Sequence, residues 1–306
     1  MNELALLLAS SIASGTPLAI AALGLIVNER AGVINLGAEG LMLVAAVAGF
    51  AGAVHSGSSA VGLLAGAAAA ALLSALLGVL LIWLNTNQYA TGLALSLFGS
   101  GFSAFIGVDY TQQSLGARAA GGVPLLSGLP FFGPAFFSHH FLVYFAIALT
   151  LALSWFFFRA KPGLVLRAIG ESPEAAQALG YQVRWIRLAA VVTGGALLGL
   201  AGAYVSVVAT PLWVEGMIAG KGWIALALTT FATWRPARAL LGAYLFGGVT
   251  MLQLNLQGRG VSLPVELLTA LPYLSTILVL VLISRNPRWI AANIPTSLGK
   301  PFRPGA

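Results

Sequence analysis

A small set of polar side chains lies within or beside long apolar runs, where they could contact a solute. These residues are Asn35, Glu39, Asn87, Gln88, Thr91 and Asn255. Polar groups are costly in lipid and tend to mark pathways, so together they predict a polar path across a membrane. Each of them alone could equally form a hydrogen bond between helices. Two classes of function therefore stay open at this point: a transport pathway, and a structural or assembly subunit of a membrane complex.

The sequence shows no pattern for hydrolytic or redox catalysis. His55, His139 and His140 form no cluster with carboxylates at metal-ligand spacing, and the absence of cysteine excludes disulfides and thiolate metal sites. The run GMIAGKG at 216–222 is similar to a phosphate loop. Its first Gly is one residue too close, however, and no Ser or Thr follows the lysine. We expect no enzyme activity, metal or cofactor in this chain, so any ATP that powers transport must bind another subunit.

The composition is that of a membrane protein. Of 306 residues, 59% are hydrophobic and 8% are charged, against about 25% charged in an ordinary soluble domain. We predict an all-α, polytopic integral membrane protein in which residues 1–306 form one domain. The net charge of +7 does not indicate nucleic-acid binding, because basic residues gather on the cytoplasmic side of membrane proteins. The N-terminus lacks a basic leader, which favours a retained first span over a signal peptide.

Apolar stretches predict nine membrane spans, each close to the roughly 20 residues that a helix needs. They fall at 7–27, 32–54, 59–84, 89–108, 139–158, 188–209, 213–234, 237–256 and 265–283. Glu215 and Lys221 interrupt the start of the seventh, which could be partly re-entrant. The long loop at 109–138 is rich in Gly, Pro and Phe and could be a cap, a lid or a partner contact. Glycines at 194–204 predict close helix packing or a moving interface.

The distribution of Lys and Arg predicts the orientation of these spans. Twelve basic residues would lie inside if segment 159–187 and the C-terminal tail are cytoplasmic. Only Arg118, Lys221 and Arg259 would then lie outside, which is a strong bias under the positive-inside rule. The N-terminus is accordingly predicted outside and the C-terminus in the cytoplasm.

The segment 32–41 has features of a broken helix. Gly32, Gly37 and Gly40 each weaken a helix by about 1 kcal/mol relative to Ala. We predict that the chain bends or breaks here and lines the path, with Asn35 offering both a donor and an acceptor. Glu39 is predicted to be structural, satisfied by a hydroxyl, amide, backbone donor or water, because an isolated carboxylate is expensive in lipid.

The polar segment 159–187 carries the signals of a short helix. Lys161, Pro162 and Gly163 are predicted to end the fifth span. Ser172 is a good N-cap, Pro173 suits the first helical position, and Glu174 favours the positive end of the helix dipole. Gly180 is a natural stop after about seven residues. On spacing alone, this helix could dock on a partner or be an idle turn in a loop.

Four stretches, in order along the chain, resemble ABC-transporter permeases for branched-chain amino acids, sugars and nucleosides. They are NERAGVINLGAEGLMLVAAVAGF (28–50), NTNQYATGLALSLFG (85–99), LRAIGESPEAAQALGY (166–181) and GKGWIALALTTFATWRPARALLGAYLFG (220–247). The resemblance implies that 159–187 is a cytoplasmic coupling loop. It also implies which residues meet the ATPase, namely Glu171, Ser172, Pro173, Glu174, Ala175, Ala176, Leu179 and Gly180.

The same resemblance implies the partners and the location. An importer of this group has a second permease, a cytoplasmic subunit that binds ATP and Mg²⁺, and an extracytoplasmic solute-binding protein, in a bacterial inner membrane. The form Asn35-Leu-Gly-x-Glu39-Gly40 is more similar to the nucleoside branch, and the length resembles the shorter of two non-identical nucleoside permeases. We therefore expect nucleosides or nucleobases, with branched-chain amino acids or sugars as the alternative. Thr233 and Arg235 depart from the Gly and Asn or Ser that relatives often have.

Overall fold

The computed structural model describes residues 2–116, 130–259 and 293–303, with residues 127, 264, 270–272, 274–275, 277–278 and 281 between them. The helices are α1 (Asn2–Arg30), α2 (Ala38–Ser56), α3 (Ser59–Ile82), α4 (Gln88–Gly107), α5 (Phe141–Arg159), α6 (Lys161–Glu171), α7 (Pro173–Ala178), α8 (Val183–Tyr204), α9 (Lys221–Phe231) and α10 (Pro236–Gly258). Short turns of 3-10 or π type are η1 (Val108–Tyr110), η2 (Gly133–Phe137) and η3 (Val205–Ala209). The all-α prediction is confirmed for these residues.

Seven helices in the described part of the chain are long and apolar enough to cross a bilayer. They are α1, α2, α3, α4, α5, α8 and α10, and each matches a predicted span. The predicted ninth span, 265–283, lies mostly outside the described residues, as does much of the 109–138 loop. The polytopic membrane fold is confirmed, whereas nine helices are not.

The predicted span at 213–234 is wrong as a continuous helix. Residues 215–220 form turns and only α9, with 11 residues, is helical. Its length of about 16 Å is half of the ~30 Å hydrocarbon layer. Leu115, which follows the C-terminal end of α4, donates its N–H to Pro211 O, just before this stretch. At the other end of the stretch, the Trp234 carbonyl accepts a hydrogen bond from Arg30, the last residue of α1. The chain therefore still crosses the bundle here, as an irregular segment followed by a half-length helix.

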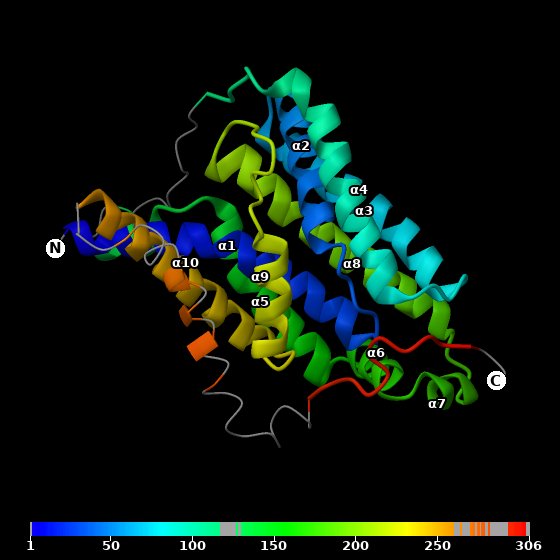
Figure 1. Ribbon diagram of the computed structural model, residues 1–306. Helices are drawn as coiled ribbons and strands as arrows, with labels where there is room; N and C mark the ends of the chain where they lie inside the picture. Colours follow the sequence, from blue (N-terminus) through cyan, green and yellow to red (C-terminus); the bar gives the residue numbers. More distant parts are fainter. Residues whose placement is uncertain are drawn as a thin grey trace.

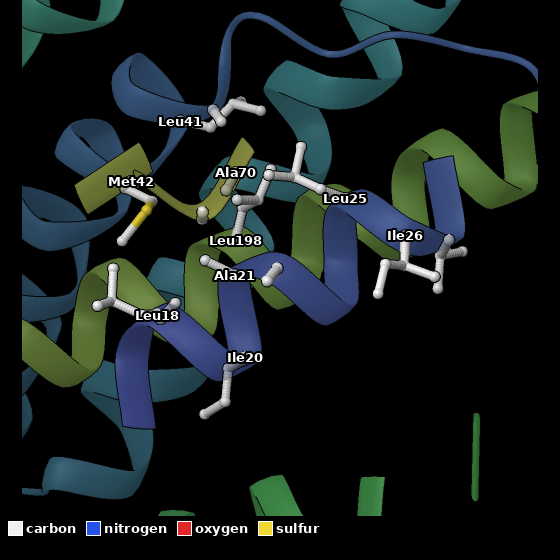
Figure 2. Close-up of a cluster of buried hydrophobic side chains, with 14 of the residues drawn as sticks. Leu18, Ile20, Ala21, Leu25, Ile26, Leu41, Met42, Ala70 and Leu198 are labelled. Atoms are coloured by element: carbon white, nitrogen blue, oxygen red, sulfur yellow. The ribbon is translucent and has the colours of Figure 1, made fainter. Parts of the chain in front are cut away.

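The core lies between α1, α2, α3 and α8, and α8 packs against the other three. Leu18, Ala21 and Leu25 of α1 face Leu198 of α8 in a cluster of fully buried side chains (Figure 2). A Cβ at Gly199 would lie 2.5 Å from the carbonyl oxygen of Gly66. The glycines of α8 therefore allow the backbones of neighbouring helices to touch, which confirms the packing interpretation of 194–204.

Basic residues gather at one end of the bundle. Figure 1 shows α6, α7 and the C-terminal segment together at this end, far from the N-terminus. The guanidinium groups of Arg167 and Arg235 both lie over the ring of Phe158, at 5.0 and 5.9 Å from its centroid. We call the end that holds α6, α7 and residues 293–303 the basic end, and the opposite one the far end.

Candidate functional site

The predicted stop after the fifth span is confirmed, but it also starts a helix that was not predicted. Helix α5 ends at Arg159, Ala160 is extended, and α6 begins at Lys161. Pro162 lies in the first turn of α6, where its missing N–H is not needed. Gly163 is required for close packing, because a Cβ there would lie 1.9 Å from the carbonyl oxygen of Phe156.

Helix α7 has the local geometry that its residues predict. The Ser172 hydroxyl accepts a hydrogen bond from Ala175 N at 3.3 Å, and Pro173 occupies the first turn. Gly180 ends the helix region with a φ of 90°, a left-handed conformation that favours glycine. Ala176 is buried, whereas the Leu179 side chain is 78% exposed. One face of α7 therefore packs against the protein through Ala176. The opposite side is exposed and ends in the apolar side chain of Leu179.

The C-terminal segment 296–302, which we call the tail strap, ties α6 and α7 to the turn after α1. Ser297 N donates to Gly170 O at 2.9 Å, and Gly299 N donates to Gly32 O at 3.3 Å. Arg187 of α8 is buried and donates to the Ser297 hydroxyl at 2.9 Å. Phe302 packs beside Ala176 of α7. Through the tail strap, the inner face of α7 is in contact with the rest of the bundle.

We expect Ser297→Ala to lower the stability of the folded protein by about 1–3 kcal/mol, because the buried Arg187 loses its hydroxyl partner. Thermal unfolding of the purified protein in detergent measures this effect. Ser100→Ala on the exposed surface of α4 is the matched control and should leave the midpoint unchanged. Equal midpoints for the two variants would contradict a structural role of the tail strap.

Residues 31–37 are irregular, as predicted, but they connect two helices at the basic end and do not break a span; the second span is continuous from Ala38. Helix α1 ends at Arg30, residues 31–37 form turns and irregular chain, and α2 begins at Ala38. Asn35 is fully buried; its Oδ1 accepts from Gly37 N at 3.1 Å, while its Nδ2 has no partner among the described residues. Gln88 Oε1 accepts from Ile34 N at 2.8 Å. Two side chains of the predicted set therefore hold the irregular segment in place.

Glu39 lies at the start of α2 and binds the start of α9. Its Oε1 accepts from Gly220 N at 2.8 Å, and its Oε2 accepts from Gly222 N at 2.7 Å. These donors are among the orphan N–H groups at a helix start, where a negative charge is favoured. The prediction that Glu39 finds a backbone donor is confirmed. The same two N–H groups belong to the run that resembles a phosphate loop, and here a carboxylate occupies them.

The remaining residues of the predicted path are dispersed. Asn87 caps α4, because its Oδ1 accepts from Tyr89 N and Ala90 N at 2.9 and 3.1 Å. Thr91 donates to the Thr86 hydroxyl at 2.9 Å. Asn255 is exposed at the far end of α10, where Arg259 pairs with Glu3 at 2.8 Å. The structure brings Asn35, Glu39 and Gln88 to one region but not Asn255, and the path itself stays a prediction.

One contact at the basic end was not predicted. The Trp234 indole N–H donates to Glu29, and Arg30 Nε and Nη2 donate to the Trp234 carbonyl at 3.2 and 3.0 Å. The sequence signal for these contacts was the adjacent acid and base, Glu29 and Arg30, at the end of the first span. Thr233, which stands where relatives often have Gly, has a φ of 49°. This left-handed backbone conformation favours Gly.

These features define a multi-pass, all-α membrane protein. The family described as branched-chain amino acid transport system / permease component matches residues 7–283, and the chain belongs to this family of ABC-transporter permeases. Membership implies a transport subunit that works with a separate ATPase. In the described residues, no group of His, Cys, Asp and Glu could hold a metal ion.

Curated relatives match nearly the whole chain. A putative glucose ABC transporter permease of Haloferax volcanii is 37% identical, over 97% of each chain. A nucleoside ABC transporter permease of Lactococcus lactis is 33% identical, over 92% of this chain and 93% of its own. A guanosine ABC transporter permease of Bacillus subtilis is 32% identical, over 97% of this chain and 98% of its own.

Proposed function

We propose that this chain is one of two non-identical permeases of an ABC importer that moves nucleosides or nucleobases into the cell. The observation that carries the proposal is full-length similarity to two relatives named for nucleoside and guanosine transport, at 33% and 32% identity. The Asn35-Leu-Gly-x-Glu39-Gly40 form around the start of α2 supports the same branch. The relative named for glucose, at 37% identity, favours a sugar as the second candidate.

We also propose that α6 and α7 lie on the cytoplasmic side of a bacterial inner membrane, with the N-terminus outside. The gathering of basic residues at the basic end supports this orientation. The exposed face of α7, with Ala175 and Leu179, would then dock on the ATP-binding subunit, which supplies ATP and Mg²⁺. An extracytoplasmic binding protein would deliver the solute to the far end.

A solute screen tests the substrate assignment. Thermal shifts of the cognate binding protein are measured with adenosine, guanosine, uridine, guanine, glucose and leucine, and uptake of the same solutes is measured in cells with and without this chain. We expect nucleosides to stabilise the binding protein, and their uptake to be lost without the chain. A shift with glucose or leucine alone would reject nucleosides. Full uptake in cells that lack the chain would instead favour an assembly subunit.

A further inference from the structure

A cavity of about 550 Å³ lies towards the far end, between α1, the residues before α5, the end of α8, the start of α9, and α10. This volume is within the ~300–1,000 Å³ typical of small-molecule sites. Its walls include Ser14, Pro17, His140, Tyr204, Met217 and Lys221. Five segments of the chain thus border one space, and none of the residues of the predicted path lines it.

The α1 wall of this cavity presents a main-chain acceptor. Pro17 has no N–H, so it cannot bond to the carbonyl of Ala13 one turn earlier. The Tyr204 hydroxyl donates to this carbonyl at 3.4 Å. Ala13 itself lines the cavity, beside Ser14. The wall therefore combines a freed carbonyl and hydroxyl groups with the apolar faces of Pro17 and Met217.

On the α9 side, the cavity is lined by the cation Lys221, and the carboxylate of Glu39 lies near it outside the cavity. Lys221 is the first residue of α9, and its Nζ donates to Ile218 O at 3.1 Å. Glu39 binds the backbone on both sides of Lys221 but does not line the cavity. Because the negative charge of Glu39 offsets the positive charge of Lys221, the cavity suits an uncharged polar solute better than an ion.

We propose that this cavity is a binding subsite for the solute inside the permease. It takes an uncharged polar molecule, which under the proposed function is a nucleoside. Lys221, Ser14 and the Ala13 carbonyl offer hydrogen bonds to its hydroxyl and amide groups, while Pro17, Met217 and Tyr204 contact its apolar faces. Because Lys221 begins α9 and Glu39 joins α9 to α2, a solute in the subsite contacts the half-length helix that borders the start of α2.

Cysteine protection tests the subsite directly, because the chain has no cysteine of its own. Ser14→Cys is placed in the assembled importer, and alkylation of this subunit is followed by mass spectrometry with and without a transported solute. We expect solute to slow labelling at Ser14→Cys at least threefold. Ser56→Cys, exposed at the far end of α2 and outside the cavity, should label at the same rate in both conditions. Equal rates with and without solute at Ser14→Cys would overturn the proposal and indicate that lipid or another subunit fills the cavity.

A size series at the same position gives a second readout. Ser14→Phe should lower uptake at least tenfold at normal expression, whereas Ser14→Ala, which removes one hydrogen bond but leaves the space open, should lower it less. Lys221→Met should raise the KM for uptake more than it lowers the maximal rate. Normal uptake by Ser14→Phe would contradict the subsite.

The solute used in these tests is chosen from the panel above by wild-type uptake, so the two claims fail separately. If nucleosides are transported but give no protection, the subsite is wrong and the proposed function stands. If glucose is transported and protects Ser14→Cys, the nucleoside assignment is wrong and the subsite stands. A chain that supports uptake of none of these solutes overturns both.

Discussion

Ala175→Arg should reduce ATP-driven uptake at least tenfold, while the variant inserts and folds as the wild type does. Ala175 is exposed on α7, opposite the buried Ala176, so a long charged side chain there does not disturb the interior. It would separate α7 from the ATPase surface on which we propose that it docks. Initial uptake rates and the stimulation of ATP hydrolysis by the loaded binding protein measure the effect, and both should fall together.

Two further variants sharpen this test. Gly180→Pro should also uncouple transport, because proline cannot adopt the φ of 90° and lacks the N–H that donates to Gln177 O at 2.8 Å. Ala237→Arg introduces the same side chain at an exposed position at the start of α10 and should retain uptake. If Ala175→Arg and Gly180→Pro both transport normally, α7 is not the docking helix.

Glu39→Leu should markedly reduce the yield of folded protein. Leucine leaves Gly220 N and Gly222 N without their acceptors in a partly buried site, and each buried N–H that stays unsatisfied costs about 1–3 kcal/mol. Glu39→Gln keeps one acceptor oxygen, so it should lose roughly half as much stability and retain most uptake. Detergent-solubilised yield, thermal midpoint and uptake per folded molecule are the measurements.

The matched control is Glu215, an exposed carboxylate on the same irregular segment that leads to α9. Glu215→Leu should change yield and midpoint little, because its side chain is exposed. Loss of uptake in Glu39→Gln at normal yield would show that the charge of Glu39 takes part in transport, and would contradict the structural role.

Local signals predicted the parts of the structure that depend on neighbouring residues. Ser172, Pro173 and Gly180 lie within one short helix, so their capping roles follow from spacing alone. The glycines at 32 and 37 likewise predicted the irregular stretch after α1. Helix α6 was missed because Pro162 and Gly163 are as compatible with the first turn of a helix as with the end of a preceding one.

Contacts between distant residues could not be predicted. Glu39 and Gly220 are 181 positions apart, and nothing in either neighbourhood indicates that they bond. Glu39 meets the start of α9, which follows Gly220 in a left-handed conformation. Residues that looked alike in sequence also differ in role: Asn87 caps a helix on the surface, whereas Asn35 is buried in the irregular stretch after α1. The cavity beside Tyr204 is formed only when five separate segments of the chain have folded together.

The central claim is that this chain forms the membrane pathway of an ATP-driven importer. The measurement that tests it most directly is uptake of radiolabelled nucleoside into liposomes that contain this chain, the second permease, the ATPase and the loaded binding protein. The account predicts accumulation with ATP and Mg²⁺, none with ADP, and an initial rate at least tenfold lower when Ala175→Arg replaces the wild-type chain. Accumulation that follows an imposed proton gradient without ATP, or that persists when this chain is omitted, would contradict it.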